Sequence, residues 1–394
     1  MNTKSFFDAM ELLDEKYIDG ALEYRKKGKR VFLKLSAAAC AALVCLSAVY
    51  YFGIKPFEKL PMLQISEGSE GSGFEGYMVK DISELADGNP WSEDTEISEL
   101  PVFENPYYYE EDYHLTKSKV RKAEKFAEEI ADRLGMDNVT ISNNAPDENE
   151  MKNLEQKFAD MGMDVPEEQF MPTEVTAENS DFTISVGKGF RATINFKAPV
   201  TLPEGYGDTD IETAQKTALY LGEKYKDLLS FEKIEIDVFG GDRDIYGEQS
   251  YSIGVFDGSG KAAERIVSYG LYKAVFYLDD NGRLISVRIR GENAYEEVGK
   301  YPIISLEEAK KLFSEGKYIT TSPEKPAEEK SIEKAELVYR SSSADKYIMP
   351  YYRFYLEIPT EWTEEGVKTY AAFYVPAIEE SYISNMPLWN GGFN

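Results

Sequence analysis

Cysteine and histidine are nearly absent from this sequence. Of its 394 residues, only Cys40 and Cys45 carry a thiol and only His114 carries an imidazole. Both cysteines fall within one apolar run, so the residues after that run can form neither a disulfide nor a zinc site with thiolate ligands. A zinc site or a histidine-based triad would have to be completed by carboxylates. We therefore expect no metal and no cofactor.

Basic residues are also scarce relative to acidic ones. The chain has 44 Lys and Arg against 71 Asp and Glu. The first 34 residues hold eight basic and six acidic residues, so the remainder holds 44 − 8 = 36 basic and 71 − 6 = 65 acidic residues, a net charge of −29. Nucleic-acid binding needs clustered Lys and Arg contacts to phosphate, and this balance argues against it.

The sequence lacks the short motifs of common enzymes. It has no glycine-rich phosphate loop followed by Lys and Ser or Thr, no HExxH and no GxSxG. FDGSGK, around Ser259, lacks the second glycine spacing and a histidine base, and is interpreted as a glycine-rich hairpin loop. DVFGGDRDIYGE, from Asp237, has Tyr246 where a calcium loop needs an oxygen ligand, and is interpreted as a loop of solvated charges. We predict that the protein is not an enzyme.

One long apolar run is present. Residues 35–54 are 20 consecutive uncharged residues, and a helix of that length covers about 30 Å, the hydrocarbon thickness of a bilayer. A basic cluster precedes the run, made of Arg25, Lys26, Lys27, Lys29, Arg30 and Lys34. By the positive-inside rule, we expect residues 1–31 in the cytoplasm, a single transmembrane helix over 32–54, and the C-terminal bulk outside the cell.

Two other interpretations of the apolar run stay open. A cleaved export signal would end near CLSA at Ala48, and a buried helix of a soluble domain is the third interpretation. A simple signal has a short charged start, whereas the segment before this run is long and patterned. Tyr50, Tyr51 and Phe52 also suit the aromatic belt at a membrane interface. These features favour a spanning helix.

Two groups of residues are candidates for protein contacts. FFDAMELLDEKYIDGALEYRKK, residues 6–27, reads as one short amphipathic helix that is too small to bury its own apolar face, so it must lie on the membrane, self-associate or dock on a partner. Its partner-binding candidates are Phe6, Met10, Leu13 and Tyr17. Small residues inside the span would let another helix approach closely, and these are Ala37, Ala38, Ala41 and Ala42.

Residues 55–115 are rich in acids, glycine and proline, and they predict a flexible acidic tether. Helical apolar spacing follows over 120–134, 151–161, 211–228 and 306–313. The last three helices are expected to start at capping boxes made by Asp147 and Glu150, by Thr209 and Glu212, and by Ser305 and Glu308. We expect these helices to cover sheets.

Alternating segments predict strands over 182–186, 192–196, 233–239, 250–256, 273–278, 284–289, 335–340, 351–358 and 368–375, with DDNG as the hairpin turn after the fifth. Helices followed by antiparallel strands indicate an α+β fold, in which a helix packs across a curled sheet. We predict two extracytoplasmic domains, over 116–291 and 301–394.

Four stretches near the C-terminus carry a family resemblance. They are KYPIISLEEAKKLFSEGKYI, AELVYR, PYYRFYLEI and KTYAAFYVPAI. Their tyrosine-proline entry, short capped helix and closing FYVPAI strand resemble the extracytoplasmic regulators of two-component systems of YycH and YycI type, and more loosely PepSY-like domains. The N-terminal LLDEKYIDGALEYRKKGKR resembles membrane-anchored anti-sigma-factor-like proteins of Gram-positive anaerobes. The resemblance implies a YycI/PepSY-like fold and regulation by protein contact, and it supplies no catalytic residues.

The sequence therefore predicts a single-pass regulatory protein of the cell membrane. Its outer part would sense or dock a partner and would modulate a signalling protein, a sensor histidine kinase or a sigma factor. Signal transfer would run through a homodimer or through helix contacts with another membrane protein. The alternative is a surface-anchored peptide- or peptidase-binding or inhibitory module without intracellular output.

Overall fold

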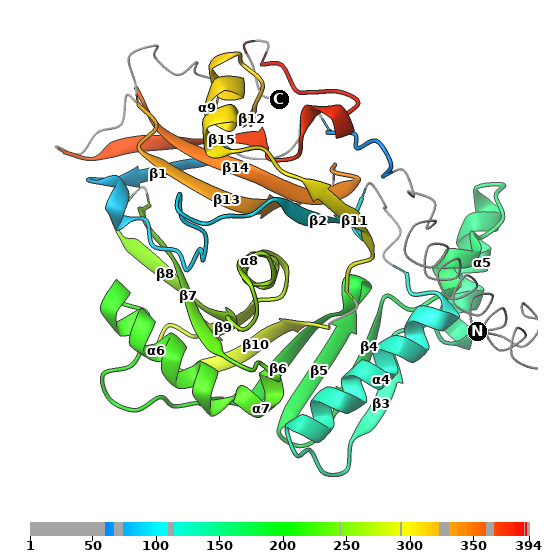
Figure 1. Cartoon of the computed structure of the whole chain (residues 1–394). Helices are drawn as coiled ribbons and strands as arrows, with labels where there is room; N and C mark the ends of the chain where they lie inside the picture. The colour runs from blue at the N-terminus through cyan, green and yellow to red at the C-terminus, as the bar shows by residue number, and fades with distance from the viewer. Residues whose placement is uncertain are drawn as a thin grey trace, which may run out of the picture. The chain divides into compact units, whose positions relative to one another are not determined.

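The computed structural model describes residues 60–66, 74–108, 114–244, 246–291, 294–322, 331–342, 344–359, 366–389 and 391. The span from Leu60 to Asn394 forms one compact unit. It is an α+β fold with two antiparallel sheets, as the sequence predicts (Figure 1). The predicted cytoplasmic segment 1–31 and span 32–54 lie outside the described residues. None of the helices within the described ranges is long and apolar enough to cross a membrane.

The first sheet has eight strands in the order β3-β4-β5-β6-β10-β9-β8-β7. Their bounds are β3 Thr140–Asn143, β4 Glu174–Glu178, β5 Phe182–Gly187, β6 Arg191–Val200, β7 Ile234–Arg243, β8 Gln249–Asp257, β9 Ala274–Leu278 and β10 Leu284–Arg290. The hairpin of β9 and β10 turns at DDNG, where Gly282 has a φ of 69°. That turn is confirmed.

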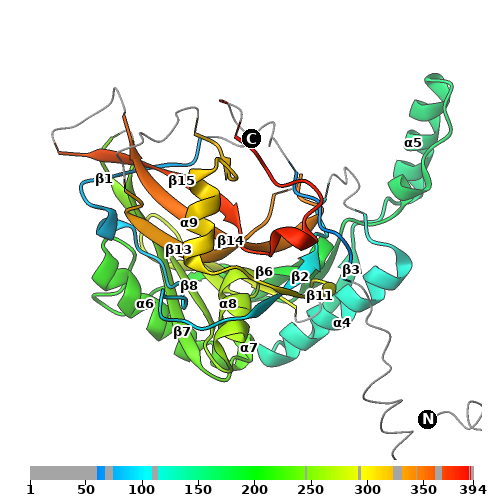
Figure 2. The same cartoon turned by 45° about the horizontal axis from the view of Figure 1, so that its top comes forward.

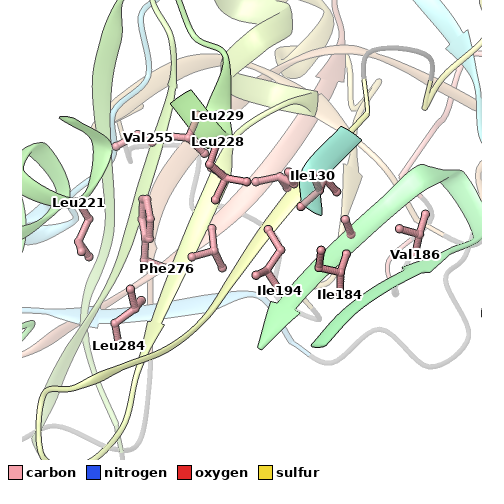
Figure 3. Packing of buried hydrophobic residues seen from close by; sticks show 14 of the residues in the cluster. Ile130, Ile184, Val186, Ile194, Leu221, Leu228, Leu229, Val255, Phe276 and Leu284 are labelled. Carbon is pink, nitrogen blue, oxygen red and sulfur yellow. The ribbon is translucent and has the colours of Figure 1, made fainter. Parts of the chain in front are cut away.

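Three helices cover one face of this sheet: α4 Lys117–Arg133, α6 Ile211–Lys224 and α7 Lys226–Leu229. The alternating apolar side chains of the strands meet the apolar stripes of the helices there. On α6, Ala214, Ala218 and Leu221 are fully buried. Figure 3 shows part of this core, in which Ile130 of α4 and Leu228 of α7 lie with strand residues such as Ile194.

One predicted sheet-covering helix does not cover a sheet. Helix α5, Glu148–Asp160, starts at the predicted capping box of Asp147 and Glu150 but contains no buried residue. It projects from the connection between β3 and β4, away from the sheets (Figures 1 and 2). Its apolar stripe is too sparse to compete with its charged positions, and Met161 just beyond it is about half exposed, at 51%.

The second sheet has seven strands, in the order β1-β15-β14-β2-β11, with β12 beside β15 and β13 beside β14. Their bounds are β1 Gly76–Val79, β2 Glu99–Glu104, β11 Glu297–Pro302, β12 Ile319–Thr320, β13 Lys334–Arg340, β14 Tyr347–Ile358 and β15 Lys368–Pro376. The seven-stranded sheet thus takes β1 and β2 from before α4 and its other strands from residue 297 onward, whereas the eight-stranded sheet lies between them in the sequence, and both belong to one compact unit.

Helix α9, Leu306–Ser314, packs on β15, and helix α8, Ala262–Leu271, lies between the two sheets (Figures 1 and 2). Contacts from α8 reach β8 of the eight-stranded sheet and β13 and β2 of the other. FDGSGK leads into α8, so its interpretation as a hairpin loop is wrong. The physical reason is that Glu264 caps the helix, accepting a hydrogen bond from the Lys261 backbone N at 2.6 Å. Short 3-10 helices span Ile82–Glu84, Glu167–Phe170, Lys188–Phe190 and Glu380–Tyr382.

The structure differs from the predicted flexible tether over residues 55–115. Where that stretch is described, it supplies β1 and β2 to the seven-stranded sheet. Leu100, Val102 and Phe103 of β2 are buried, and their removal from water is the driving force that orders this acidic stretch. Trp91 also packs against Tyr352, with ring centroids 5.7 Å apart.

The segment between β1 and β2 fastens one sheet to the other. Ala86 and Gly240 of β7 form an isolated antiparallel bridge, with N to O distances of 3.0 and 3.3 Å. A Cβ on the neighbouring Gly241 would lie 2.2 Å from the carbonyl oxygen of Glu84. Glycine at this position therefore permits a backbone approach that other residues would block.

Two of the three predicted capping boxes are present, at Asp147 with Glu150 and at Ser305 with Glu308. The third is wrong in its cap residue. Asp210, not Thr209, caps α6 and accepts a hydrogen bond from the Thr213 backbone N at 2.9 Å. Asp and Thr are both good caps, so sequence spacing alone does not separate adjacent candidates.

Candidate functional site

A polar cavity of about 650 Å³ lies between the end of α8 and strands β12 to β15. Cationic side chains and hydroxyl groups share its wall with a few apolar groups. The cations are Lys273 after α8, Arg340 of β13 and Arg353 of β14. We call this space the interlayer cavity. It combines convergent charged groups with room for a small ligand, and such a cleft is a candidate binding site.

Strand alternation explains why charges line this cavity. Residues two apart on a strand share a face, so Lys334, Glu336 and Arg340 of β13 lie on one side while Leu337 packs on the other. Arg353 of β14 is directly opposite Glu336 in the register. The sequence therefore places one acid and one arginine face to face inside an otherwise apolar sheet.

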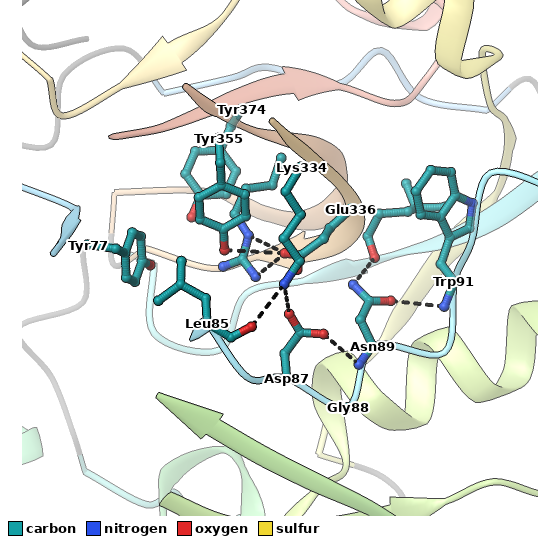
Figure 4. Close-up of polar contacts among 12 residues, drawn as sticks. Tyr77, Leu85, Asp87, Gly88, Asn89, Trp91, Lys334, Glu336, Tyr355 and Tyr374 are labelled. Atoms are coloured by element: carbon teal, nitrogen blue, oxygen red, sulfur yellow. Dashed lines mark hydrogen bonds and ion pairs between the residues drawn. The ribbon is translucent and has the colours of Figure 1, made fainter. Parts of the chain in front are cut away.

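Glu336 is the centre of a buried charge network (Figure 4). Its Oε2 accepts a hydrogen bond from Arg353 Nε at 2.8 Å and one from the Tyr355 hydroxyl at 3.3 Å. Its Oε1 lies 2.7 Å from Lys334 Nζ, which also contacts the carboxylate of Asp87 at 2.5 Å. The Glu336 side chain is only 4% exposed. Its desolvation is offset by two cations and a hydroxyl.

The two carboxyl groups of the network titrate in opposite directions. Burial raises the pKa of Glu336, and its hydrogen bond with Asp87 raises it further. Burial also acts to raise the pKa of Asp87, but the hydrogen bond with Glu336 and the Lys334 charge outweigh it and lower that pKa to about 2. Acid therefore protonates Glu336 before Asp87.

This pairing predicts a pH dependence of stability. The pKa of Asp87 in the folded protein, about 2, is below the usual unfolded value of about 3.9. Asp87 thus stabilises the fold above pH 4 or so, and that contribution, about 2 kcal/mol, is lost as pH falls towards 2. We expect Asp87→Asn to reduce this loss of unfolding free energy at acidic pH. Urea unfolding across that pH range measures it, and a loss as large as that of the wild type would contradict the prediction.

Glu336 acts in the other sense, because its pKa is raised. Its contribution to stability is present below its unfolded pKa, about 4.3, and is lost as pH rises through its folded pKa. The Asp87→Asn variant should keep the part of this loss that burial of Glu336 causes and lose the part that Asp87 adds. The loss of stability at rising pH should therefore become smaller in this variant.

Tyrosine hydroxyls extend the network to β1 and β15. The hydroxyls of Tyr77 and Tyr374 each donate to Glu75 Oε1, both at 2.6 Å. Burial, followed by the charge of Glu75, raises the pKa of each tyrosine. Both hydroxyls therefore stay protonated at physiological pH and act as donors.

A second buried ion pair joins the eight-stranded sheet to the cavity. Asp237 of β7 is fully buried and lies 2.7 Å from Lys273 Nζ. It also accepts a hydrogen bond from the Gly88 backbone N at 3.0 Å. The Lys273 ammonium lies over the rings of Tyr269 and Phe239, 4.7 and 5.0 Å from their centroids. The interpretation of the Asp237 segment as solvated charges is therefore wrong at this residue.

A third pair lies at the far end of β13. Arg340 Nη1 donates to Asp345 Oδ2 at 2.8 Å, and the Ser342 backbone N donates to the same oxygen at 3.0 Å. Each cation that lines the cavity thus has an internal carboxylate partner. An acidic ligand can bind at this wall by replacing an internal carboxylate as the ion-pair partner of one of these cations. Among the described residues, no group of three or more His, Cys, Asp or Glu is placed to hold a metal.

The residues predicted from the sequence to bind partners lie elsewhere. Phe6, Met10, Leu13 and Tyr17, and the membrane-packing residues Ala37, Ala38, Ala41 and Ala42, all fall outside the described part of the chain. Sequence reasoning did not select the interlayer cavity. A signal was present, because KAELVYR and YYRFYLEI carry charges at positions that alternate with buried apolar ones.

Comparisons with known proteins assign no family. No protein-family model matches the sequence, and no curated protein matches it. One similar solved structure is that of an uncharacterized protein from Eubacterium rectale, with 12% identity and a TM-score of 0.28. The alignment covers 71% of this chain and 82% of that one. At that TM-score, the likeness carries no argument about function.

Proposed function

We propose that this protein is a single-pass membrane regulator of YycH/YycI type, anchored by residues 32–54, with its C-terminal part outside the cell. The basic cluster followed by 20 uncharged residues supports the anchor and its orientation. The interlayer cavity supports a receptor role and is the observation that carries the proposal. Its volume of about 650 Å³ suits a small ligand or a peptide side chain.

Ligand binding would act through the internal ion pairs. Lys273, which directly precedes β9, pairs with Asp237 of β7 at 2.7 Å, and Asp237 also accepts a hydrogen bond from the Gly88 backbone N in the segment between β1 and β2. An acidic group that enters the cavity and pairs with Lys273 would release Asp237, which is fully buried. The contact between the sheets would then change, because an uncompensated buried carboxylate is unfavourable.

Transfer of the signal needs only modest coupling. A coupling free energy of about 1 to 3 kcal/mol between ligand binding outside and partner binding inside is enough to change the affinity for the partner. The N-terminal amphipathic helix would dock that partner, a sensor histidine kinase or a sigma factor, through Phe6, Met10, Leu13 and Tyr17. The small residues of the span would support a homodimer or a helix contact.

Crosslinking and pull-down from intact membranes test this function. We expect the full chain to recover a signalling protein, and a chain lacking residues 5–24 to lose it. A matched pair of variants sharpens the result. Serine in place of Phe6, Met10 and Leu13 should abolish recovery, whereas serine in place of Asp8, Glu11 and Asp14 should preserve it.

The surface-anchored binding module is the second candidate, and the same experiment separates it. Recovery of outer-surface partners alone, unchanged by the deletion of residues 5–24, would leave the inner helix as a simple anchor. That result would reject intracellular output and would favour peptide or peptidase binding by the outer part.

A further inference from the structure

Two arginines face each other on neighbouring strands of the eight-stranded sheet. Arg191 of β6 and Arg290 of β10 are directly opposite in the register, and Figure 1 shows these strands side by side. Residues in such positions have Cβ atoms about 4.5 to 5.5 Å apart, and like charges there repel. The pair is therefore unfavourable unless something neutralises it.

No internal carboxylate fills that role in the described part of the chain. The arginines that form ion pairs there are Arg243, Arg265, Arg283, Arg340 and Arg353. Arg191 and Arg290 are not among them, although the sequence has 71 Asp and Glu residues. Nη1 of Arg290 is shielded from solvent and has no hydrogen-bond partner within the described residues. A buried donor left in this way costs free energy until an acceptor reaches it.

Aromatic rings hold both guanidinium groups. The Cζ atoms of Arg191 and Arg290 lie 5.8 and 6.0 Å from the ring centroid of Tyr107. Arg290 also lies 5.2 Å from the ring centroid of Tyr295. The Tyr107 hydroxyl donates to the backbone carbonyl of Lys188 at 2.6 Å, which fixes the ring. Stacking orients the planar cations and leaves their N–H groups for an acceptor.

Both arginines line a cavity of about 540 Å³, which we call the arginine cavity. The two arginines share its wall with Lys188 and with hydroxyl groups, which belong to Thr173, Ser185, Thr193, Ser341 and Ser342. Glu174 is the one carboxylate among the described lining residues. The wall therefore offers many donors and a cationic excess, in a chain of net charge −27.

We propose that the arginine cavity binds the phosphate group of a small ligand, either inorganic phosphate or a phosphate monoester. Guanidinium groups donate paired N–H bonds to oxyanions, and the hydroxyls can donate to the remaining oxygens. A phosphate presents three or four acceptor oxygens to donors from two strands, whereas a carboxylate presents two. Its negative charge also removes the repulsion between Arg191 and Arg290.

This site is additional to the proposed receptor cavity and does not depend on it. Ser341 and Ser342 line both cavities. They follow Arg340 of β13, so a phosphate in the arginine cavity would lie beside the end of the strand that carries the buried charge network. Phosphate binding and partner recovery are separate readouts, so either proposal can fail alone.

Calorimetric titration of the full chain in detergent tests the proposal, at constant pH and ionic strength. The probes are inorganic phosphate, glycerol 3-phosphate and acetate. We expect phosphate to bind, and Arg191→Gln and Arg290→Gln each to weaken binding about tenfold or more. Acetate should bind at least about tenfold more weakly than phosphate. The matched control is Arg283→Gln, since Arg283 lies just before β10, is 42% exposed and pairs with Asp279. It should leave phosphate binding unchanged.

Thermal unfolding in chloride separates a lost site from a lost fold. Arg191→Gln and Arg290→Gln each remove a contact with an aromatic ring but also remove the repulsion between the two arginines, so we expect little change in the melting temperature. If Arg290→Gln fails to fold, the exposed Arg191 decides the matter through Arg191→Gln. Binding of both phosphates assigns monoesters to the site, and binding of inorganic phosphate alone restricts it to the free ion. No phosphate binding, binding unaffected by both substitutions, or equal affinity for acetate would overturn the proposal.

Discussion

Replacing Lys273 by methionine is expected to destabilise the fold by about 3 to 5 kcal/mol. Methionine keeps most of the apolar stem of lysine but removes the ammonium that lies 2.7 Å from Asp237. The Asp237 carboxylate is fully buried, and its remaining hydrogen bond comes from the Gly88 backbone N at 3.0 Å. Urea unfolding of the part from Leu60 to Asn394, followed by tryptophan fluorescence, measures the change.

Lys233→Met is the matched control for this experiment. Lys233 also pairs with a carboxylate, Glu235, at 2.6 Å, but its side chain is 62% exposed. Water screens such a pair, so we expect a loss of at most about 1 kcal/mol. Adding Asp237→Asn to Lys273→Met should recover part of the stability, because the unpaired charge is then gone. Equal losses for the two lysine variants would show that burial of Asp237 is not decisive.

Gly241→Ala is expected to cost about 4 kcal/mol, the second large effect. Gly241 has a φ of 92°, and an added Cβ would lie 2.2 Å from the backbone oxygen of Glu84. The substitution therefore combines backbone strain with overlap at the place where the segment before β2 crosses β7. Urea unfolding gives the total cost. Hydrogen exchange should show faster opening at the amides of Ala86 and Gly240, which bridge there.

Gly282→Ala separates strain from overlap. Gly282 also has a positive φ, 69°, but an added Cβ would meet nothing within 4 Å. Strain alone should cost about 1 to 2 kcal/mol. The difference between the two variants measures the close approach of the two backbones. Equal costs would mean that the segment near Glu84 moves aside easily and does not fasten the sheets.

Local patterns were enough to predict the elements with strong periodicity. The stripe of α6 and the alternation of β5 to β10 and β13 to β15 appear in the sequence because each element buries one face against a neighbour. β1 and β2 were missed, since acids and Pro101 surround their few apolar residues. Their partners, β15 and β14, lie more than two hundred positions away, and a local window contains no sign of them.

The candidate site was harder to predict from the sequence for the same reason. Lys334, Glu336 and Arg353 are visible as charges in strands, but the network also includes Asp87, which pairs with Lys334 and comes from the stretch interpreted as a tether. α8 was missed because FDGSGK suggested a turn, whereas ten residues with buried Ile266, Tyr269 and Leu271 follow it. An ion pair between segments that are far apart in the sequence cannot be predicted from local patterns, because only the fold brings the two segments together.

The pairing of β1 with β15 and of β2 with β14 gives the chain an order of assembly. The eight-stranded sheet is built from one continuous stretch between Lys117 and Arg290, with its own core, so it can fold as soon as that stretch has been synthesised. β1 and β2 emerge first but must wait for the last strands. Until then, their apolar residues and unpaired edges need protection from aggregation. Loss of the final thirty residues, which include β15, would therefore leave β1 without its partner strand, so that the beginning of the fold would be disrupted as well as its end.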